Sequence, residues 1–187
     1  MRQQRKEISD RNVIENLLRS APVGRLGTIG RDGCPRIKPL NFVYANDRIY
    51  FHSARAGEKI DDLLRDSRVC FEVDLPIAYV KGRQDDPCKA SYLYQSVILY
   101  GKAALVGADP ERRKALLELM RKYQPGGGYG DFPEAKLALT AVVRIDIERM
   151  TGKEDIGKGA MRERVLAGLQ AGTPLPMEMI DIQGEDG

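Results

Sequence analysis

Hydrophobic residues recur at every second position in several stretches of the chain. Val, Phe and Val alternate with other residues in 69–73, and Ala, Val, Ile and Ile do so in 141–147. Residues 23–53 read as three further strands separated by the turn sequences GRDG and AND, and residues 91–107 read as one long strand, bent near Gly101. Because this alternation is typical of strands with one buried face, it predicts about six strands, mostly in successive hairpins.

Other segments carry hydrophobic residues at helical spacing. Residues 9–20 begin with two possible capping residues, Ser and Asp, and continue with an apolar stripe. Residues 57–67 repeat that spacing, and residues 109–123 begin with Asp-Pro, which is typical of a helix start. A weaker helical pattern covers residues 161–169. Helices are therefore predicted before, between and after the strands.

This order of elements predicts a mainly β, α+β fold, a small antiparallel barrel with flanking helices. Residues 76–90 hold two prolines, a glycine and several charges, and are predicted to form a long loop. One domain is expected over residues 1–152. Residues 153–187 are expected to form a C-terminal tail that packs on the body or on a partner subunit.

Composition narrows the functional classes. The 187 residues are 42% hydrophobic and carry 30 basic and 27 acidic side chains, which are interleaved along the chain. Nucleic acid is therefore not an expected partner, and no stretch approaches the roughly 20 apolar residues of a membrane span. The three cysteines form no CxxC pair and there is one histidine, so no metal site is predicted. We expect a cytoplasmic protein.

The single histidine lies where a predicted strand turns into a helix, in the sequence YFHSARAGEKIDDLL. A helix N-terminus at this place would aim free backbone N–H groups at one spot, which suits a phosphate. Ser53 could donate a hydrogen bond there, Gly57 allows close approach, and Lys59 supplies a charge. The alternative is an ordinary junction in which Ser53 caps the helix and Lys59 is solvated. Spacing alone ranks that alternative slightly ahead.

The long strand in residues 91–107 holds two polar residues, Gln95 and Ser96, among aromatic and aliphatic neighbours. Buried polar side chains need partners, so these two either bond within the fold or point at a ligand. The glycine-rich sequences GRDG and PGGGYG read as turns, because neither joins a strand to a helix in the order that a phosphate loop requires.

Three segments together resemble a known family. The sequences GRLGTIGRDGCPRIKPLNFVY, IYFHSARAGEKIDDLLRDSRVCFEVD and YQSVILYGKAALV are similar, in that order, to the FMN-binding split barrels related to pyridoxamine 5'-phosphate oxidase. The nitroimidazole-resistance branch of that family is the nearest match. The resemblance covers roughly residues 8–152.

The resemblance implies a six-stranded antiparallel split barrel that binds FMN in a groove between the two subunits of a homodimer. It implies three sets of FMN-binding residues and no metal. The flavin ring would lie along the second strand, largely against backbone groups; the phosphate side would be formed after the strand that ends at the histidine; and the long strand would contribute a third set. The residues are Lys38, Pro39, Leu40, Asn41 and Phe42 for the ring, His52, Ser53 and Lys59 for the phosphate side, and Gln95, Ser96 and Val97 for the long strand.

The activity implied is that of an FMN-dependent oxidoreductase. It would reduce a small planar electrophile, a nitro-heterocycle or a quinone, with electrons from NAD(P)H. His52 would be a phosphate-side ligand or a catalytic proton donor near the ring, and its alternative role is that of a hydrogen-bonded strand residue. Alternatives for the whole protein are a non-catalytic flavin carrier or sensor, and a relative that binds haem or a deazaflavin. The arginine-rich C-terminal segment that holds the pyridine substrate in true pyridoxamine phosphate oxidases has no counterpart here, which argues against that specific activity.

Overall fold

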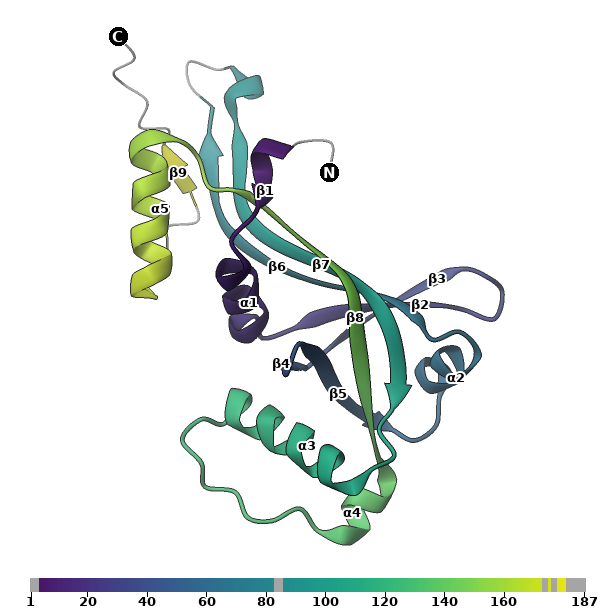
Figure 1. Cartoon of the computed structure of the whole chain (residues 1–187). Helices are drawn as coiled ribbons and strands as arrows, with labels where there is room; N and C mark the ends of the chain where they lie inside the picture. The colour runs from purple at the N-terminus through teal and green to yellow at the C-terminus, as the bar shows by residue number, and fades with distance from the viewer. Residues whose placement is uncertain (1–3, 83–85, 173–174, 176–177, 181–187) are drawn as a thin grey trace.

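A computed structural model describes residues 4–82, 86–172, 175 and 178–180 (Figure 1). Two short 3-10 helices are present besides the elements drawn with labels, η1 (Gln4–Lys6) and η2 (Pro87–Lys89). The helices are α1 (Arg11–Ser20), α2 (Glu58–Arg65), α3 (Asp109–Tyr123), α4 (Glu134–Leu139) and α5 (Gly159–Ala171). The strands are β1 (Glu7–Ile8), β2 (Gly24–Ile29), β3 (Pro35–Leu40), β4 (Val43–Ala45), β5 (Arg48–Ala54), β6 (Arg68–Lys81), β7 (Ser91–Leu105), β8 (Thr140–Asp155) and β9 (Glu178–Ile180).

The strands form one strongly curved sheet. Its main path runs β3-β2-β6-β7-β8-β5-β4, with β1 paired to β8 and β9 paired to β6. Every pairing is antiparallel except that of β6 with β9. The sheet is open, with β3 and β4 at its two edges, as in a split barrel, which confirms the predicted fold class. The second predicted strand, between the turns GRDG and AND, is divided into β3 and β4, and the other five correspond to β2, β5, β6, β7 and β8; the short strands β1 and β9 were not predicted.

The largest core cluster fills the concave side of the sheet, where alternate residues of β6, β7 and β8 point inward. Phe71, Val73, Val97 and Leu99 are fully enclosed there. α1 covers this core and buries three side chains of its apolar stripe, and the Asp10 side chain caps the helix by accepting from the Asn12 backbone N–H. The predicted helix in residues 9–20 is therefore confirmed, with Asp10 rather than Ser9 as its cap.

Two smaller clusters lie outside that core. One joins α3 to the other face of β5 and β8 through Tyr50, Leu116 and Val142. The other joins α5 to the outer ends of β6 and β7 through Ile77, Leu93 and Val165. The weak helical pattern in residues 161–169 is thus a real helix, which packs on the sheet (Figure 1).

The predicted loop over residues 76–90 is wrong for residues 76–81, whereas residues 82 and 86–90 lie between the strands and residues 83–85 lie outside the described residues. β6 continues to Lys81, and with β7 it forms a long hairpin arm that extends beyond the rest of the sheet (Figure 1). Pro76 lies where the β6–β7 register shifts, a position that tolerates a residue without an N–H. Strand alternation resumes after it because Ala78 and Val80 are buried on the α5 side.

Gly101 allows the bend that was expected in the long strand. The β7–β8 register shifts between Tyr100 and Gly101. A Cβ at Gly101 would lie 2.1 Å from the Asp146 carbonyl oxygen, so only glycine permits the two backbones to approach this closely. The bend curls β7 and β8 and lets β5 pair with the far half of β8.

Within the part of the chain that the structure describes, none of the helices combines the length and the apolar composition that a membrane crossing requires.

Candidate functional site

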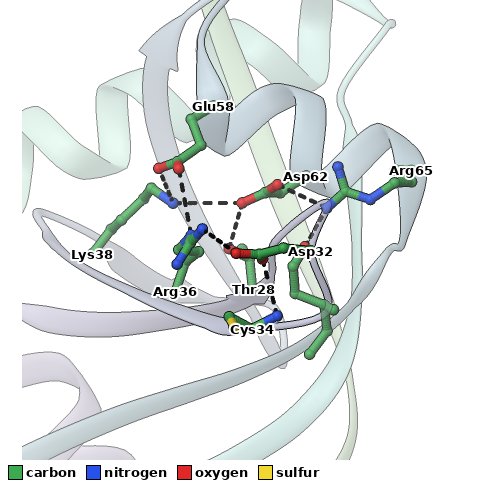
Figure 2. Close-up of polar contacts among 9 residues, drawn as sticks. Thr28, Asp32, Cys34, Arg36, Lys38, Glu58, Asp62 and Arg65 are labelled. Carbon is green, nitrogen blue, oxygen red and sulfur yellow. Dashed lines mark hydrogen bonds and ion pairs between the residues drawn. The ribbon is translucent and has the colours of Figure 1, made fainter.

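A cluster of charged side chains forms where α2 passes the β2–β3 hairpin. α2 follows β5 and buries Ile60 and Leu63 in the core, which turns Glu58 and Asp62 toward the strands. Because β3 alternates, Arg36 and Lys38 share the face toward α2 and complete the cluster. Figure 2 shows these contacts, which join two segments at least 20 positions apart in the sequence.

Asp62 is the fixed centre of the cluster. Its carboxylate is almost fully buried, accepts a hydrogen bond from Thr28 Oγ1 at 3.1 Å, and pairs with Arg65 Nη2 at 2.8 Å. Lys38 Nζ lies 3.6 Å away (Figure 2). The Arg65 hydrogen bond lowers the pKa of Asp62 more than any other interaction, so the carboxylate is charged at neutral pH.

Lys38 presents an ammonium group whose donors are not all used. Its Nζ is buried and lies 2.9 Å from Glu58 Oε2, but this contact lacks the geometry of a hydrogen bond and Nζ has no other hydrogen-bond partner. A buried ammonium normally satisfies its donors. Lys38 therefore has unsatisfied donors, which an oxygen of a bound anion could accept from only after a covering side chain moves.

Lys59, the second residue of α2, adds a further positive charge. Its ammonium is half-buried and lies 5.3 Å from the centre of the Phe51 ring. Burial lowers the pKa of Lys59, and the nearby charge of Lys38 lowers it further. Among the described residues no carboxylate pairs with Lys59. Two lysines therefore raise the local positive potential without a matching anion at Lys59.

The histidine and the helix N-terminus lie beside these lysines. Partial burial lowers the pKa of His52, and the charge of Lys59 adds to the effect, so the ring is neutral at pH 7. His52 and Ser53 point to opposite faces of β5, because Ser53 is on the side of Phe51. Gly57, with φ of 119°, takes the capping position of α2 without a side-chain cap. The first N–H groups of α2 thus have no capping side chain.

The predicted ring-side residues occupy β3 and the turn that follows it. Pro39 and Asn41 are exposed, whereas the side chains of Leu40 and Phe42 pack into the core, so only the backbone of these two could meet a ligand. The Phe42 backbone is held on both sides by Tyr123, whose hydroxyl lies 3.0 Å from the Phe42 N–H nitrogen and 3.0 Å from its carbonyl oxygen.

Tyr123 and its neighbour Lys122 were missed by the sequence analysis. The Lys122 ammonium lies 3.7 Å from the centre of the Phe42 ring, and burial lowers its pKa to about 8. Both residues end α3, some 80 positions from Phe42, and their sequence reads as an ordinary helix end. Only the packing of α3 against β4 brings them to this turn.

The third predicted set, on β7, lies apart from the other two within one chain. In the sheet register Lys38 lies in one row with Leu26, Phe71 and Leu99, so three strand spacings, about 14 Å, separate Lys38 from Leu99 on β7. Gln95 lies four residues farther along β7, an offset of about 13 Å along the strand. The structure therefore brings Lys38 and Lys59 to one region, and leaves Gln95 in another.

Each of the β7 residues has partners within the fold. Gln95 is buried and donates to Glu154 Oε2 at 2.9 Å. Ser96 Oγ lies 3.5 Å from the Lys153 carbonyl oxygen, on the opposite, outer face. Val97 is fully enclosed in the core. The predicted contact of these three residues with a ligand stays a prediction. Of the three, only Ser96 lies on the outer face of the sheet.

An open cavity of about 820 Å³ lies next to the cluster. Arg31, Asp32, Arg36, Glu58, Asp61, Asp62 and Arg65 line it. None of the residues predicted from the sequence lines this cavity, although Lys38 forms ion pairs with two residues that do, Glu58 and Asp62. The spacing of Glu58 and Asp62, four residues apart on one helix, could have indicated a shared face, but not what faces it.

Comparison with known proteins identifies a family that agrees with the resemblance seen in the sequence. Residues 10–154 match the family model described as pyridoxamine 5'-phosphate oxidase. A candidate 5-nitroimidazole antibiotic resistance protein from Bacteroides thetaiotaomicron has 29% sequence identity and a TM-score of 0.71, over 79% of this chain and 86% of that one. A search of curated proteins finds no significant match.

Two further solved structures share the fold at lower identity. The flavocytochrome Anf3 from Azotobacter vinelandii has 22% identity and a TM-score of 0.75, covering 89% of this chain and 77% of that one. An FAD and haem binding protein from Mycobacterium smegmatis has 22% identity and a TM-score of 0.74, covering 87% and 80%.

Proposed function

Because the chain belongs to the pyridoxamine 5'-phosphate oxidase family, we propose that it binds FMN and acts as an oxidoreductase. The single observation that carries the proposal is the pair of lysines formed by Lys38 on β3 and Lys59 at the start of α2. Lys38 keeps unused donors, and Lys59 lacks a carboxylate partner among the described residues. A dianionic phosphate would supply hydrogen-bond acceptors for Lys38 and a negative partner for Lys59.

These residues fit the phosphate end of a flavin nucleotide. Lys59 and Lys38 would bind the phosphate oxygens, Ser53 would donate a hydroxyl hydrogen bond, and the free N–H groups of α2 would add to the site. Lys is suited to this role as a compact charge with three donors. The flavin ring would lie toward β3, against Pro39, Asn41 and the backbone of Leu40 and Phe42.

The bound flavin would supply two-electron redox chemistry, and the chain would position it and admit a substrate. Tyr123 fixes the turn against which the ring would lie, because its hydroxyl bonds both backbone groups of Phe42. His52 is neutral at pH 7 and would either hold a proton near the ring or support the phosphate side.

The protein is proposed to be a homodimer with one FMN at each subunit junction. Gln95, Ser96 and Val97 lie apart from Lys38 along the sheet of one chain, and a second copy would bring its own β7 to the site through Ser96, the member on the outer face. The outer face of the sheet offers a surface for that copy. Ile37 on β3 is 71% exposed, and Ile98 and Tyr100 on β7 are exposed on the same face of the sheet, with β2 and β6 between the two strands.

The dimer predicts a particle of twice the chain mass in light scattering at micromolar concentration. Ile37→Asp should convert this particle to the monomer, because it places a charge at an exposed apolar residue of this face without disturbing the core of either subunit. Leu139→Asp is the matched control, since Leu139 is 69% exposed on α4, away from that face. A wild-type monomer, or a dimer that Ile37→Asp leaves intact, contradicts the proposal.

The proposed substrate is a small planar electrophile, a nitro-heterocycle or a quinone, reduced with electrons from NAD(P)H. Similarity to the candidate 5-nitroimidazole resistance protein supports this class. A second candidate is a flavin carrier or sensor without turnover. It is favoured by the lack of a paired acid and base at the site, where His52 has no carboxylate partner among the described residues.

Turnover separates these two candidates. FMN-loaded protein is expected to oxidise NADH or NADPH faster when menadione or metronidazole is added, above the rate of free FMN at the same concentration. NAD(P)H absorbance at 340 nm follows the reaction. A flavin-loaded protein that shows no dependence on either electrophile would refute the reductase and leave the carrier.

A further inference from the structure

We propose that Glu58 is an internal counter-ion that competes with the ligand's phosphate, and that it sets the preference of the site between phosphorylated and neutral flavins. This inference rests on the proposed function, because it concerns the same site. It assigns a role to a carboxylate that neither the sequence pattern nor the family match singled out.

The Glu58 carboxylate occupies the place where an anionic ligand would meet β3. Its Oε2 lies 2.9 Å from Lys38 Nζ, and its Oε1 lies 3.5 Å from Arg36 Nε, so each oxygen faces one cation (Figure 2). A phosphate group placed here would offer the same two cations similar acceptors. Glu58 therefore stands in for a ligand anion.

Glu58 can leave this place at little cost. Its side chain is 61% exposed, and its only side-chain partners in the described chain are the ion pairs with Arg36 and Lys38. Solvent at the Glu58 end of both ion pairs weakens them. Asp62 differs, because it is almost fully buried and held by Thr28 and Arg65. The cluster thus has one fixed anion, Asp62, and one movable anion, Glu58.

Glu58 affects a phosphorylated flavin and a flavin without a phosphate differently. A phosphate that reaches Lys38 meets the Glu58 charge at a few ångströms, so Glu58 must rotate away and give up its cations. A flavin without a phosphate does not compete for Lys38 and leaves Glu58 in place. Glu58 is therefore expected to weaken the binding of FMN and to leave riboflavin binding unchanged.

The test compares apo-protein carrying Glu58→Gln with wild type in fluorescence titrations against FMN and riboflavin. The variant is expected to bind FMN about tenfold more tightly, the effect of removing one like charge near a dianion, and riboflavin within twofold of wild type. Asp61→Asn is the matched control, because Asp61 lines the same cavity on the same helix but pairs with no cation in the described chain. It should change neither affinity by more than about twofold.

The inference is wrong if Glu58→Gln leaves FMN affinity unchanged, or if it weakens FMN and riboflavin alike, which would make Glu58 a ligand of the ribityl chain. Inorganic phosphate, titrated into the same proteins by 31P NMR, gives a readout independent of flavin. If wild type binds neither flavin, the proposed function fails, and tighter phosphate binding by Glu58→Gln still supports the counter-ion. Equal phosphate affinity would reject it.

Discussion

Asp62→Asn is expected to lower the free energy of unfolding by about 2–3 kcal/mol at pH 7. The substitution removes a buried carboxylate that accepts from Thr28 and pairs with Arg65, and it leaves the buried Lys38 ammonium beside a neutral amide. The loss is smaller than for a fully enclosed ion pair because Arg65 reaches solvent. Urea unfolding followed by circular dichroism measures it, with Asp61→Asn as the control that should change stability by less than about 0.5 kcal/mol.

The pH dependence gives this prediction a second readout. The folded-state pKa of Asp62 lies below its unfolded value, so its contribution is fully present above the unfolded pKa, about 4. It is lost as pH falls through the folded pKa. The stability difference between wild type and Asp62→Asn should therefore be constant from about pH 5 to pH 7 and shrink below about pH 4. A difference that stays constant down to pH 3 would show that the carboxylate's charge is not the cause.

Lys59→Ala is expected to weaken FMN binding by about 10- to 150-fold, the loss of a charge-assisted contact worth about 1.5–3 kcal/mol. Riboflavin affinity should change by less than about twofold, because the lost partner is the phosphate. Fluorescence titration of the apo-protein measures both. Lys102→Ala is the matched control, since Lys102 lies on β7 and pairs with Glu148 rather than with a residue of α2.

The stability of the Lys59 variant separates binding from folding. Lys59 is held near the like charge of Lys38, so its removal should leave the unfolding free energy of the apo-protein within about 1 kcal/mol of wild type. Unchanged FMN affinity in a folded Lys59→Ala protein would remove the phosphate assignment. A variant that loses FMN and riboflavin equally would point to a general disturbance of the site.

The sequence indicated where along the chain the site begins, but not which residues from other strands join it. The junction at residues 50–64 predicted a strand, a helix start and a lysine in its first turn, all of which are local properties. The partners of that helix come from β3, and no local pattern tells which strand a helix faces. Lys38 was reached through family resemblance, whereas Glu58 and Asp62 emerged only when α2 was seen against β3.

The same limit explains the corrections to the fold. Strand alternation predicted β6 up to Pro76, but the proline and the charges beyond it read as a loop. The strand continues because Ala78 and Val80 are buried against α5, which lies some 80 residues later in the sequence and could not be foreseen from the local pattern. Tyr123 was missed for a similar reason. Its hydroxyl serves the backbone of Phe42, and a tyrosine at a helix end carries no sign of such a distant partner.

The wild-type arm of the flavin titrations tests the central claim most directly, because that claim is that Lys38 and Lys59 bind the phosphate of FMN. Wild-type apo-protein, titrated in parallel with FMN and riboflavin in one buffer, is expected to bind FMN at least tenfold more tightly, with the preference falling as salt screens the lysines. Equal affinities for the two flavins, or no binding of FMN, would contradict it.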